Sequence, residues 1–253
     1  MKNKHSTILE QITLAKEKGK KLLSVLIDPD TDELILNQML HEAEKASVDY
    51  IFVGGSLLYK GQMEICLEML QSKTHIPLVI FPGNELQFSN KADAILFLSL
   101  ISGRNADLLI GKHVQVAPFV KQSGIEVLPT GYMLIDSGKA TTASYISQTQ
   151  PIPYNKPGIA MATAIAGELL GLKLLYMDCG SGAEKPISEE MLHLVRQHCS
   201  LPIVVGGGVT TPEQASVLWK SGADMVVLGS VLEKDPSLTS AFTKKRNELS
   251  LLS

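Results

Sequence analysis

Short runs of aliphatic residues recur along the chain, and each ends at a glycine, a proline or a polar residue. Uninterrupted apolar runs of about four to eight residues are typical of parallel strands that are buried on both faces. The pattern therefore predicts eight strands, at residues 22–27, 50–53, 78–81, 94–98, 125–128 (continuing through 132–135), 174–177, 203–205 and 225–228.

Longer amphipathic stretches separate most of these strands and predict helices at residues 32–46, 62–71, 158–170, 188–198 and 211–221. Strands that alternate with helices imply right-handed crossovers and a parallel sheet. Eight strands favour closure of that sheet, so the predicted fold class is α/β, a (β/α)₈ or TIM barrel. Such barrels take about 250 residues, and the 253 residues here predict a single domain over residues 1–253.

Two segments interrupt the alternation. Residues 82–91 are too short and too broken for a crossover helix, so the third helix is predicted to be missing or replaced by an extended segment. Residues 141–157 contain three prolines, which forbid a continuous helix there. Because an insertion after the fifth strand lies at the catalytic face of a barrel, this segment is a lid, a wall of the substrate cleft or a plain surface loop.

Composition narrows the class of protein. The 23 lysines and arginines nearly balance the 26 aspartates and glutamates, which argues against a broad surface for nucleic acid. The three cysteines form no Cys-x-x-Cys pair, so neither a disulfide framework nor a thiolate zinc site is predicted. The N-terminus is not typical of a signal peptide, and no apolar run reaches the roughly 18 residues of a transmembrane segment. We therefore expect a cytoplasmic protein.

Two glycine-rich turns follow the last two predicted strands. Gly206, Gly207 and Gly208 end the seventh strand, and Gly229 and Ser230 end the eighth. Barrels of this class build phosphate sites in their late loops, where glycine lets backbone N–H groups approach phosphate oxygens. The two adjacent loops therefore predict a phosphorylated substrate. The alternative is that the glycines merely turn each strand into the next helix.

Polar side chains also end the first two predicted strands. Asp28 follows the first strand and Ser56 the second, so we expect the two to face each other across neighbouring strand tips. One carboxylate and one hydroxyl suit Mg²⁺, which takes its other ligands from water and substrate phosphates, and this suggests a diphosphate substrate. Asp28 or Asp30 could instead cap the helix that begins near Thr31, and Asp30 is assigned to capping or a supporting role.

The sixth predicted strand ends in a further carboxylate, Asp178, followed by the donor-rich turn Gly180-Ser181-Gly182. Strands six, seven and eight are therefore expected to converge on one anionic ligand. Cys179 could be a nucleophile, but no histidine suggests itself as its partner, so a small packing residue is the favoured interpretation.

Eight motifs follow one another along the chain: Leu-Ile-Asp-Pro-Asp, Phe-Val-Gly-Gly-Ser, Phe-Pro-Gly-Asn, Ser-Gly-Arg-Asn, Pro-Thr-Gly-Tyr, Tyr-Met-Asp-Cys-Gly-Ser-Gly-Ala, Val-Gly-Gly-Gly-Val and Leu-Gly-Ser. Together they resemble the geranylgeranylglyceryl phosphate synthase family, including its bacterial members. The resemblance implies a Mg²⁺-dependent prenyltransferase on a modified barrel, which joins the 3-hydroxyl of sn-glycerol 1-phosphate to a long polyprenyl diphosphate, such as geranylgeranyl diphosphate, through an ether bond. It also implies a homo-oligomer, a dimer or larger, with transient membrane proximity for its lipid product.

The resemblance assigns roles to individual residues. Asp28 and Ser56 would hold Mg²⁺, and Asp178, with Tyr176, would be catalytic. Many family members carry glutamate where this chain has Asp178, so the carboxylate is one methylene shorter here. The residues implied to bind glycerol phosphate are Tyr176, Met177, Asp178, Cys179, Gly180, Ser181, Gly182, Gly207, Gly208, Gly229 and Ser230.

A long prenyl tail needs an apolar groove, and a set of leucines and phenylalanines could line it or belong to the barrel core: Phe81, Phe88, Leu96, Phe97, Leu98 and Leu100. Two other functions remain open. Another phosphate-binding barrel enzyme, such as a phosphosugar isomerase or cyclase, would share the glycine loops without needing the Asp28–Ser56 pair. A catalytically dead barrel could sense a phosphorylated ligand, although the retention of Asp28 and Asp178 argues against it.

Overall fold

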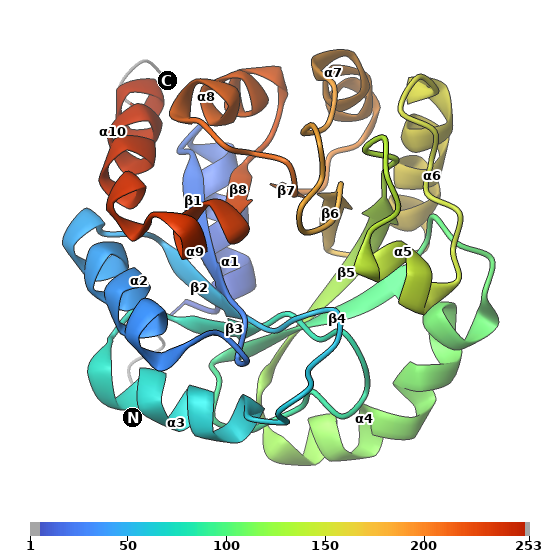
Figure 1. Cartoon of the computed structure of the whole chain (residues 1–253). Coiled ribbons are helices and arrows are strands. Elements are labelled where there is room, and N and C mark those ends of the chain that lie inside the picture. Colours follow the sequence, from blue (N-terminus) through green and yellow to red (C-terminus); the bar gives the residue numbers. More distant parts are fainter. Residues whose placement is uncertain (1–5, 251–253) are drawn as a thin grey trace.

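The computed structural model of the protein describes residues 6–250. Its centre is a closed barrel of eight parallel strands, each paired with the next along the chain and β8 with β1 (Figure 1). The strands are β1 (Leu22–Ile27), β2 (Tyr50–Val53), β3 (Leu78–Ile80), β4 (Ala94–Leu100), β5 (Glu126–Leu134), β6 (Leu174–Asp178), β7 (Ile203–Gly206) and β8 (Met225–Leu228).

The helices lie outside this barrel, except α1, which lies across one of its ends (Figure 1). They are α1 (Ile8–Glu17), α2 (Glu33–Ala46), α3 (Met63–Lys73), α4 (Lys112–Ser123), α5 (Thr142–Ser147), α6 (Pro157–Leu169), α7 (Glu189–His198), α8 (Pro212–Ser221), α9 (Ser230–Lys234) and α10 (Thr239–Ser250). A π-helical turn, η1 (Asp107–Gly111), precedes α4, and a 3₁₀ turn, η2 (Pro236–Leu238), precedes α10.

The predicted closed barrel is confirmed. All eight predicted strands are present, and their ends agree with the structure to within two residues. The two pieces predicted for the fifth strand are one continuous strand, β5, which pairs with β4 and β6 along its length. The five predicted helices are also present, again to within two residues. Side chains of Asp32, Ser188 and Thr211 cap three of them by accepting backbone N–H bonds, as their positions before the helices favour.

The predicted break after the third strand is confirmed as well, because residues 81–93 contain no helix. The η1–α4 segment was not predicted. Its pattern is weak because Pro118 lies inside the helix and the large apolar residues Val114 and Phe119 face solvent. The segment 141–157 contains the short helix α5 ahead of its three prolines, begun by a capping box between Thr141 and Ser144.

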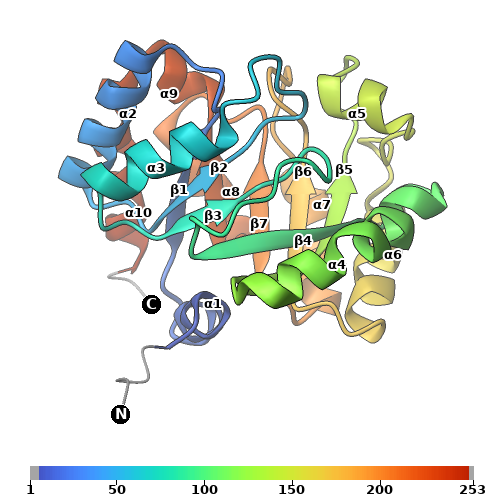
Figure 2. The same cartoon turned by 90° about the horizontal axis from the view of Figure 1, so that it is seen from below.

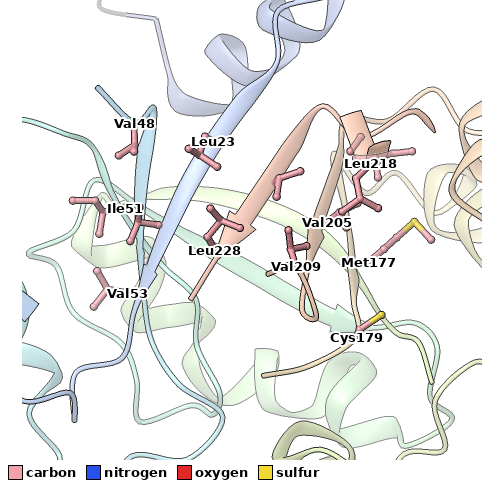
Figure 3. Packing of buried hydrophobic residues seen from close by; sticks show 14 of the residues in the cluster. Leu23, Val48, Ile51, Val53, Met177, Cys179, Val205, Val209, Leu218 and Leu228 are labelled. Carbon is pink, nitrogen blue, oxygen red and sulfur yellow. The ribbon is translucent and has the colours of Figure 1, made fainter. Parts of the chain in front are cut away.

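Buried side chains form two layers, because strand residues point alternately into and out of the barrel. The inner layer includes Phe52 and Tyr176, and it also holds Ile8 and Ile12 of α1. Helix α1 lies across one end of the barrel, the end opposite to α5 (Figure 2). The outer layer, between strands and helices, includes Met177 (Figure 3). With its amino end closed in this way, the barrel is open at the carboxyl ends of its strands.

Candidate active site

A cavity of about 600 Å³ lies at the carboxyl ends of the strands. The tip of every strand, or the loop that follows it, contributes to its wall. The predicted site residues that line this cavity are Asp28, Ser56, Tyr176, Asp178, Ser181, Gly207, Gly208, Gly229 and Ser230. Residues far apart in the sequence, and predicted separately from strand tips, therefore share one cavity.

Asp28 stands at the tip of β1 with one of its carboxylate oxygens engaged. Oδ1 accepts the backbone N–H of Asp30 at 2.9 Å, whereas Oδ2 accepts no hydrogen bond from residues 6–250. A Cβ atom at Gly55 would lie 2.5 Å from Oδ2, so glycine at that position keeps the space beside this oxygen open. Burial raises the pKa of Asp28 above its usual range, against the lowering effect of the Asp30 N–H.

The capping alternative for Asp28 and Asp30 is not what the structure shows. Asp32 caps α2, since its Oδ1 accepts the N–H of Leu34 at 2.9 Å. Asp30 instead accepts the N–H groups of Tyr59, at 2.5 Å, and Lys60, at 3.2 Å. It therefore holds the loop after β2 in place, which is the supporting role expected for it, and Asp28 is left facing the cavity.

A second carboxylate on this side of the cavity, Glu233 of α9, was missed by the sequence analysis. The hydroxyl of Thr31 donates to Glu233 Oε1 at 3.3 Å, which fixes this side chain beside the β1 loop. Burial raises the pKa of Glu233, and the charge of Asp28 raises it further. Two carboxylates therefore face the β1 side of the cavity and create a local negative potential that attracts cations. No sequence signal could have found Glu233, because its partners come from the other end of the chain.

Asp178, at the end of β6, is only 7% exposed, and both of its carboxylate oxygens are engaged. Oδ1 accepts the N–H of Gly180 at 2.7 Å, and Oδ2 accepts the hydroxyl of Tyr132 at 2.5 Å. Burial raises the pKa of Asp178, while the hydrogen bonds from Tyr132 and Gly180 oppose that rise. Tyr132 is the last residue of the Pro-Thr-Gly-Tyr motif, and nothing in the sequence alone assigns it a role.

Three aromatic rings pack around this carboxylate and line the cavity. The ring centroid of Phe81 lies 4.8 Å from that of Tyr176 and 5.9 Å from that of Tyr132, and the two tyrosine rings are 5.6 Å apart. The register of β5 and β6 places Tyr132 directly beside Tyr176. A Cβ atom at Gly206 would lie 2.5 Å from the Tyr176 hydroxyl, so glycine there makes room for the ring.

The two glycine loops present free backbone donors to the cavity. The N–H groups of Gly207, Gly208, Gly229 and Ser230 find no acceptor among residues 6–250. Successive unpaired N–H groups of this kind form an anion-binding concavity. Gly207 and Gly208 also have φ angles of 81° and 72°, a conformation that favours glycine whether or not an anion binds. The glycines therefore suit both interpretations of these loops, anion binding and the turn from strand to helix.

Four of the residues implied to bind glycerol phosphate do not line the main cavity. The side chains of Met177 and Cys179, which alternate along the chain with Tyr176 and Asp178, point outward and are buried against the helices (Figure 3). Burial raises the pKa of the Cys179 thiol, which agrees with a packing role. The N–H of Gly180 is taken by Asp178, and Gly182 lines a smaller neighbouring cavity of about 340 Å³.

The apolar side of the cavity lies around the segment that lacks a helix. Its lining includes all six residues predicted for a groove, Phe81, Phe88, Leu96, Phe97, Leu98 and Leu100. The facing wall comes from η1 and α4, with Leu108, His113, Val116 and Val120. An ion pair of 2.5 Å between Lys112 of α4 and Glu85 ties the two walls together. The helix missing after β3 thus coincides with an apolar groove.

The segment at residues 141–157 forms part of the cavity wall. Ala143, Ile146 and Ser147 of α5 line the cavity. Ile152 anchors the rest of the segment, because it exchanges backbone hydrogen bonds with the chain just after β5. Of the three interpretations offered for this segment, the structure therefore favours a wall of the cleft.

Metal-binding side chains are sparse. In the described part of the chain, no group of three or more histidine, cysteine, aspartate or glutamate side chains is arranged to hold a metal ion. A cation at Asp28 would therefore need ligands from water or substrate. Likewise, none of the helices between residues 6 and 250 is long and apolar enough to cross a membrane.

Comparison with known proteins gives a consistent result. Residues 14–246 match the PcrB family. The chain is 49% identical over 235 residues to a geranylgeranylglyceryl phosphate synthase of Chitinophaga pinensis, covering 92% of this chain and 93% of that one. It is 38% identical to the enzyme of the same name from Pyrococcus horikoshii, covering 95% and 94%.

Solved structures are similar over the whole barrel. The (S)-3-O-geranylgeranylglyceryl phosphate synthase of Thermoplasma acidophilum, in complex with its substrate sn-glycerol-1-phosphate, has a TM-score of 0.91 at 31% identity, covering 96% of this chain and all of that one. An N-acetylmannosamine-6-phosphate 2-epimerase of Clostridium perfringens has a TM-score of 0.58 at 13% identity, covering 96% and 99%, which shows a shared fold alone.

Proposed function

The chain belongs to the PcrB family, and from this premise we propose that it is a prenyltransferase that joins the 3-hydroxyl of sn-glycerol 1-phosphate to a long polyprenyl diphosphate, with release of diphosphate. One observation carries the proposal. A single cavity has free backbone N–H donors on one side and an apolar groove on the other, with a carboxylate pair beside β1. A small anionic acceptor and a long apolar donor can therefore meet in it.

The glycerol phosphate is proposed to bind at the loops after β6, β7 and β8. Its phosphate would accept the free N–H groups of Gly207, Gly208, Gly229 and Ser230. Ser181 lines the cavity nearby and adds a hydroxyl donor. The substrate in the similar Thermoplasma acidophilum structure has this chemistry, which supports the choice of ligand.

We propose Mg²⁺ as the cofactor, held by Asp28 and Ser56. The residues fit this ion, because Asp28 Oδ2 is free, Gly55 leaves space beside it and Ser56 lines the same cavity. Mg²⁺ is usually bound by one or two carboxylates together with waters and substrate phosphates, which suits a site without a third protein ligand. When bound, the ion would neutralise the diphosphate and make it a better leaving group.

The reacting atoms are proposed to meet between these two ends, beside Asp178. Its carboxylate would take up the proton that the 3-hydroxyl of glycerol phosphate loses as the hydroxyl oxygen attacks the allylic carbon. The rings of Phe81, Tyr132 and Tyr176 would exclude water from that carbon, which otherwise would react with water instead of the acceptor.

The prenyl tail is proposed to lie in the apolar groove between residues 81–88 and α4. Because the product is a lipid, we also propose transient contact with a membrane. Exposed apolar side chains on η1, α4 and α6, namely Ile110, Val114, Phe119 and Ile159, support assembly into a homo-oligomer.

The phosphosugar alternative has weaker support. The similarity to a phosphosugar epimerase extends to the fold alone, and a phosphosugar would leave the apolar groove empty. A barrel that only senses a ligand would have no use for two carboxylates beside β1.

The proposal is tested by product analysis. Purified protein is incubated with Mg²⁺, sn-glycerol 1-phosphate and a panel of prenyl diphosphates, and the products are identified by mass spectrometry. We expect a prenyl glycerol phosphate ether with long-chain donors, and its loss when EDTA is added or sn-glycerol 3-phosphate replaces the acceptor. Absence of an ether product with every donor would contradict the proposal.

A further inference from the structure

The carboxylate of Asp178 has little free capacity to bind a substrate hydroxyl directly. Its side chain is only 7% exposed, and each of its carboxylate oxygens already accepts a hydrogen bond from the protein. The N–H of Gly180 holds Oδ1, and the hydroxyl of Tyr132 holds Oδ2. The group that stands beyond this carboxylate, on the Oδ2 side, is therefore the Tyr132 hydroxyl.

Tyr132 is held so that its hydroxyl cannot easily turn away. The ring lines the cavity between Phe81 and Tyr176, at centroid distances of 5.9 and 5.6 Å. Its backbone lies in the β4–β5–β6 sheet, directly beside Tyr176. The hydroxyl donates its single proton to Asp178, so its oxygen lone pairs remain available to accept a proton from another group.

We propose that Tyr132 is a catalytic residue that relays the proton of the acceptor hydroxyl to Asp178, whose two carboxylate oxygens are already engaged by the protein. This inference rests on the proposed function. In the step, a bond forms between the acceptor oxygen and the allylic carbon, and the bond from that carbon to the diphosphate oxygen breaks, its electron pair leaving with diphosphate. The acceptor proton passes to Tyr132 Oη, and the Tyr132 proton passes to Asp178 Oδ2.

The electrostatics of the pair suit a relay better than a free phenolate. Burial, and then the charge of Asp178, raises the pKa of Tyr132 well above its usual value, so the hydroxyl keeps a proton until another replaces it. Burial also raises the pKa of Asp178, which makes it a better proton acceptor than a solvated aspartate. Both protons would therefore move within one step.

The test is a double-mutant cycle of Tyr132→Phe and Asp178→Glu, read as single-turnover rates at saturating substrates. Phenylalanine keeps the ring but removes the relay, so Tyr132→Phe alone should lower the rate by about 10²–10⁴-fold. Glutamate can reach the acceptor directly, so in the Asp178→Glu background the same substitution should cost less than about tenfold. Strong non-additivity of this kind shows that the two residues act as a unit.

Tyr50→Phe is the matched control. Tyr50 is a buried tyrosine on β2 whose hydroxyl bonds to Gln11 of α1, in the inner layer at the closed end of the barrel. Its substitution should leave the transfer rate within about twofold, although it likewise removes a buried tyrosine hydroxyl and its hydrogen bond. Binding of sn-glycerol 1-phosphate, measured by calorimetry, should stay within about threefold in Tyr132→Phe, because the phosphate donors lie on other loops.

Isotope effects supply a readout that does not depend on the variants folding well. In mixtures of H₂O and D₂O, the single-turnover rate of the wild-type protein should depend on the deuterium fraction quadratically, since two protons move. A linear dependence, equal losses in both backgrounds, or a Tyr132→Phe rate near that of wild type would overturn the relay. If the wild-type protein makes no ether product, the proposed function fails instead, so the two failures are distinguishable.

Discussion

The partly buried carboxylate of Asp28, at the tip of β1, lowers the stability of the folded protein when it is ionised. Burial raises the pKa of Asp28 in the folded protein above its value in the unfolded chain, so folding favours its protonated form. The stabilising effect of protonated Asp28 is fully present at low pH and is lost as the pH rises through the raised pKa. At neutral pH the ionised side chain therefore destabilises the fold, as often happens at functional sites.

We predict that Asp28→Asn abolishes transfer and raises the melting temperature at neutral pH in the absence of divalent cations. Asparagine still accepts the Asp30 N–H but removes the buried charge. The difference in melting temperature should shrink as the pH falls toward about 4, the usual aspartate range. Melting curves across this pH range, beside product assays, check both parts. Wild-type turnover at low Mg²⁺ would remove Asp28 from the metal site.

The glycines of the loops after β7 and β8, where phosphate is proposed to bind, give a second prediction at this scale. A Cβ atom at Gly207 would lie 2.6 Å from the Gly180 nitrogen, whereas one at Gly229 would meet only Leu26, at 3.5 Å. Gly207→Ala should therefore lower the melting temperature as well as the affinity for glycerol phosphate. Gly229→Ala should mainly lower the affinity for glycerol phosphate, with little effect on the affinity for prenyl diphosphate. Calorimetric titration with each substrate tests this prediction. If the affinity for glycerol phosphate is unchanged in both variants, its phosphate does not bind at these loops.

For single residues, the position in the site could be predicted from the sequence where a polar residue directly follows a predicted strand. Asp28, Ser56 and Asp178 could be placed because a polar residue after a buried run lies at the open end of a barrel. Tyr132 and Glu233 could not be placed. The role of Tyr132 depends on its hydrogen bond to Asp178, and that of Glu233 on its position near the charge of Asp28. These arise from strand register and from packing of the last part of the chain on the first.

At the scale of elements, the apolar groove has two walls. Helix α4 forms one wall, and the segment after β3 that lacks a helix forms the other. The lack could be predicted, because residues 82–91 hold too few helix-forming residues for a crossover. The facing helix α4 could not, since its apolar residues are not confined to one face and Pro118 interrupts its pattern. The residues of α4 that face the groove could be identified only from the structure, because they line the cavity.

Helix α4 should therefore limit the length of the tail. Val116→Trp would place a bulky ring in the groove, and we predict a shift of the products toward shorter prenyl chains. The rate constant kcat/KM for the longest accepted donor should fall by at least tenfold, on the order of what a misfitting group costs in an apolar pocket. Ala117→Trp, one residue further on the exposed face, is the control and should leave the product distribution unchanged. Unchanged chain length in Val116→Trp would place the tail elsewhere.

On the scale of the whole molecule, large apolar side chains are exposed on α4 and α6. Val114 and Phe119 of α4 are 66% and 64% exposed, and Ile159, near the start of α6, is 48% exposed. Such a surface is typical of an interface between copies. We predict a dimer or larger assembly that Phe119→Glu dissociates, with Leu34→Glu on α2 as the control. Light scattering after size exclusion measures the mass, and a wild-type monomer would contradict the prediction.

Closure of the barrel could be predicted from the number of apolar runs, since each run is one buried strand. The use of α1 as a plug could not. Ile8 and Ile12 pack against the inner layer, and that layer exists only once the eight strands have closed into a barrel. Backbone N–H groups at the start of α1 then bond to Glu126 of β5, a contact across more than a hundred residues.

The division of the cavity between two halves of the barrel bears on how such a protein diverges. The apolar lining of the cavity comes from residues around β3, β4 and α4, where the tail is proposed to bind, while the loops after β6, β7 and β8 line the side proposed for the head group. Substitutions at sites without shared partners act almost independently in free energy. A lineage can therefore drift toward a longer or shorter lipid through mutations in one half, while selection preserves the handedness of the glycerol unit through the other.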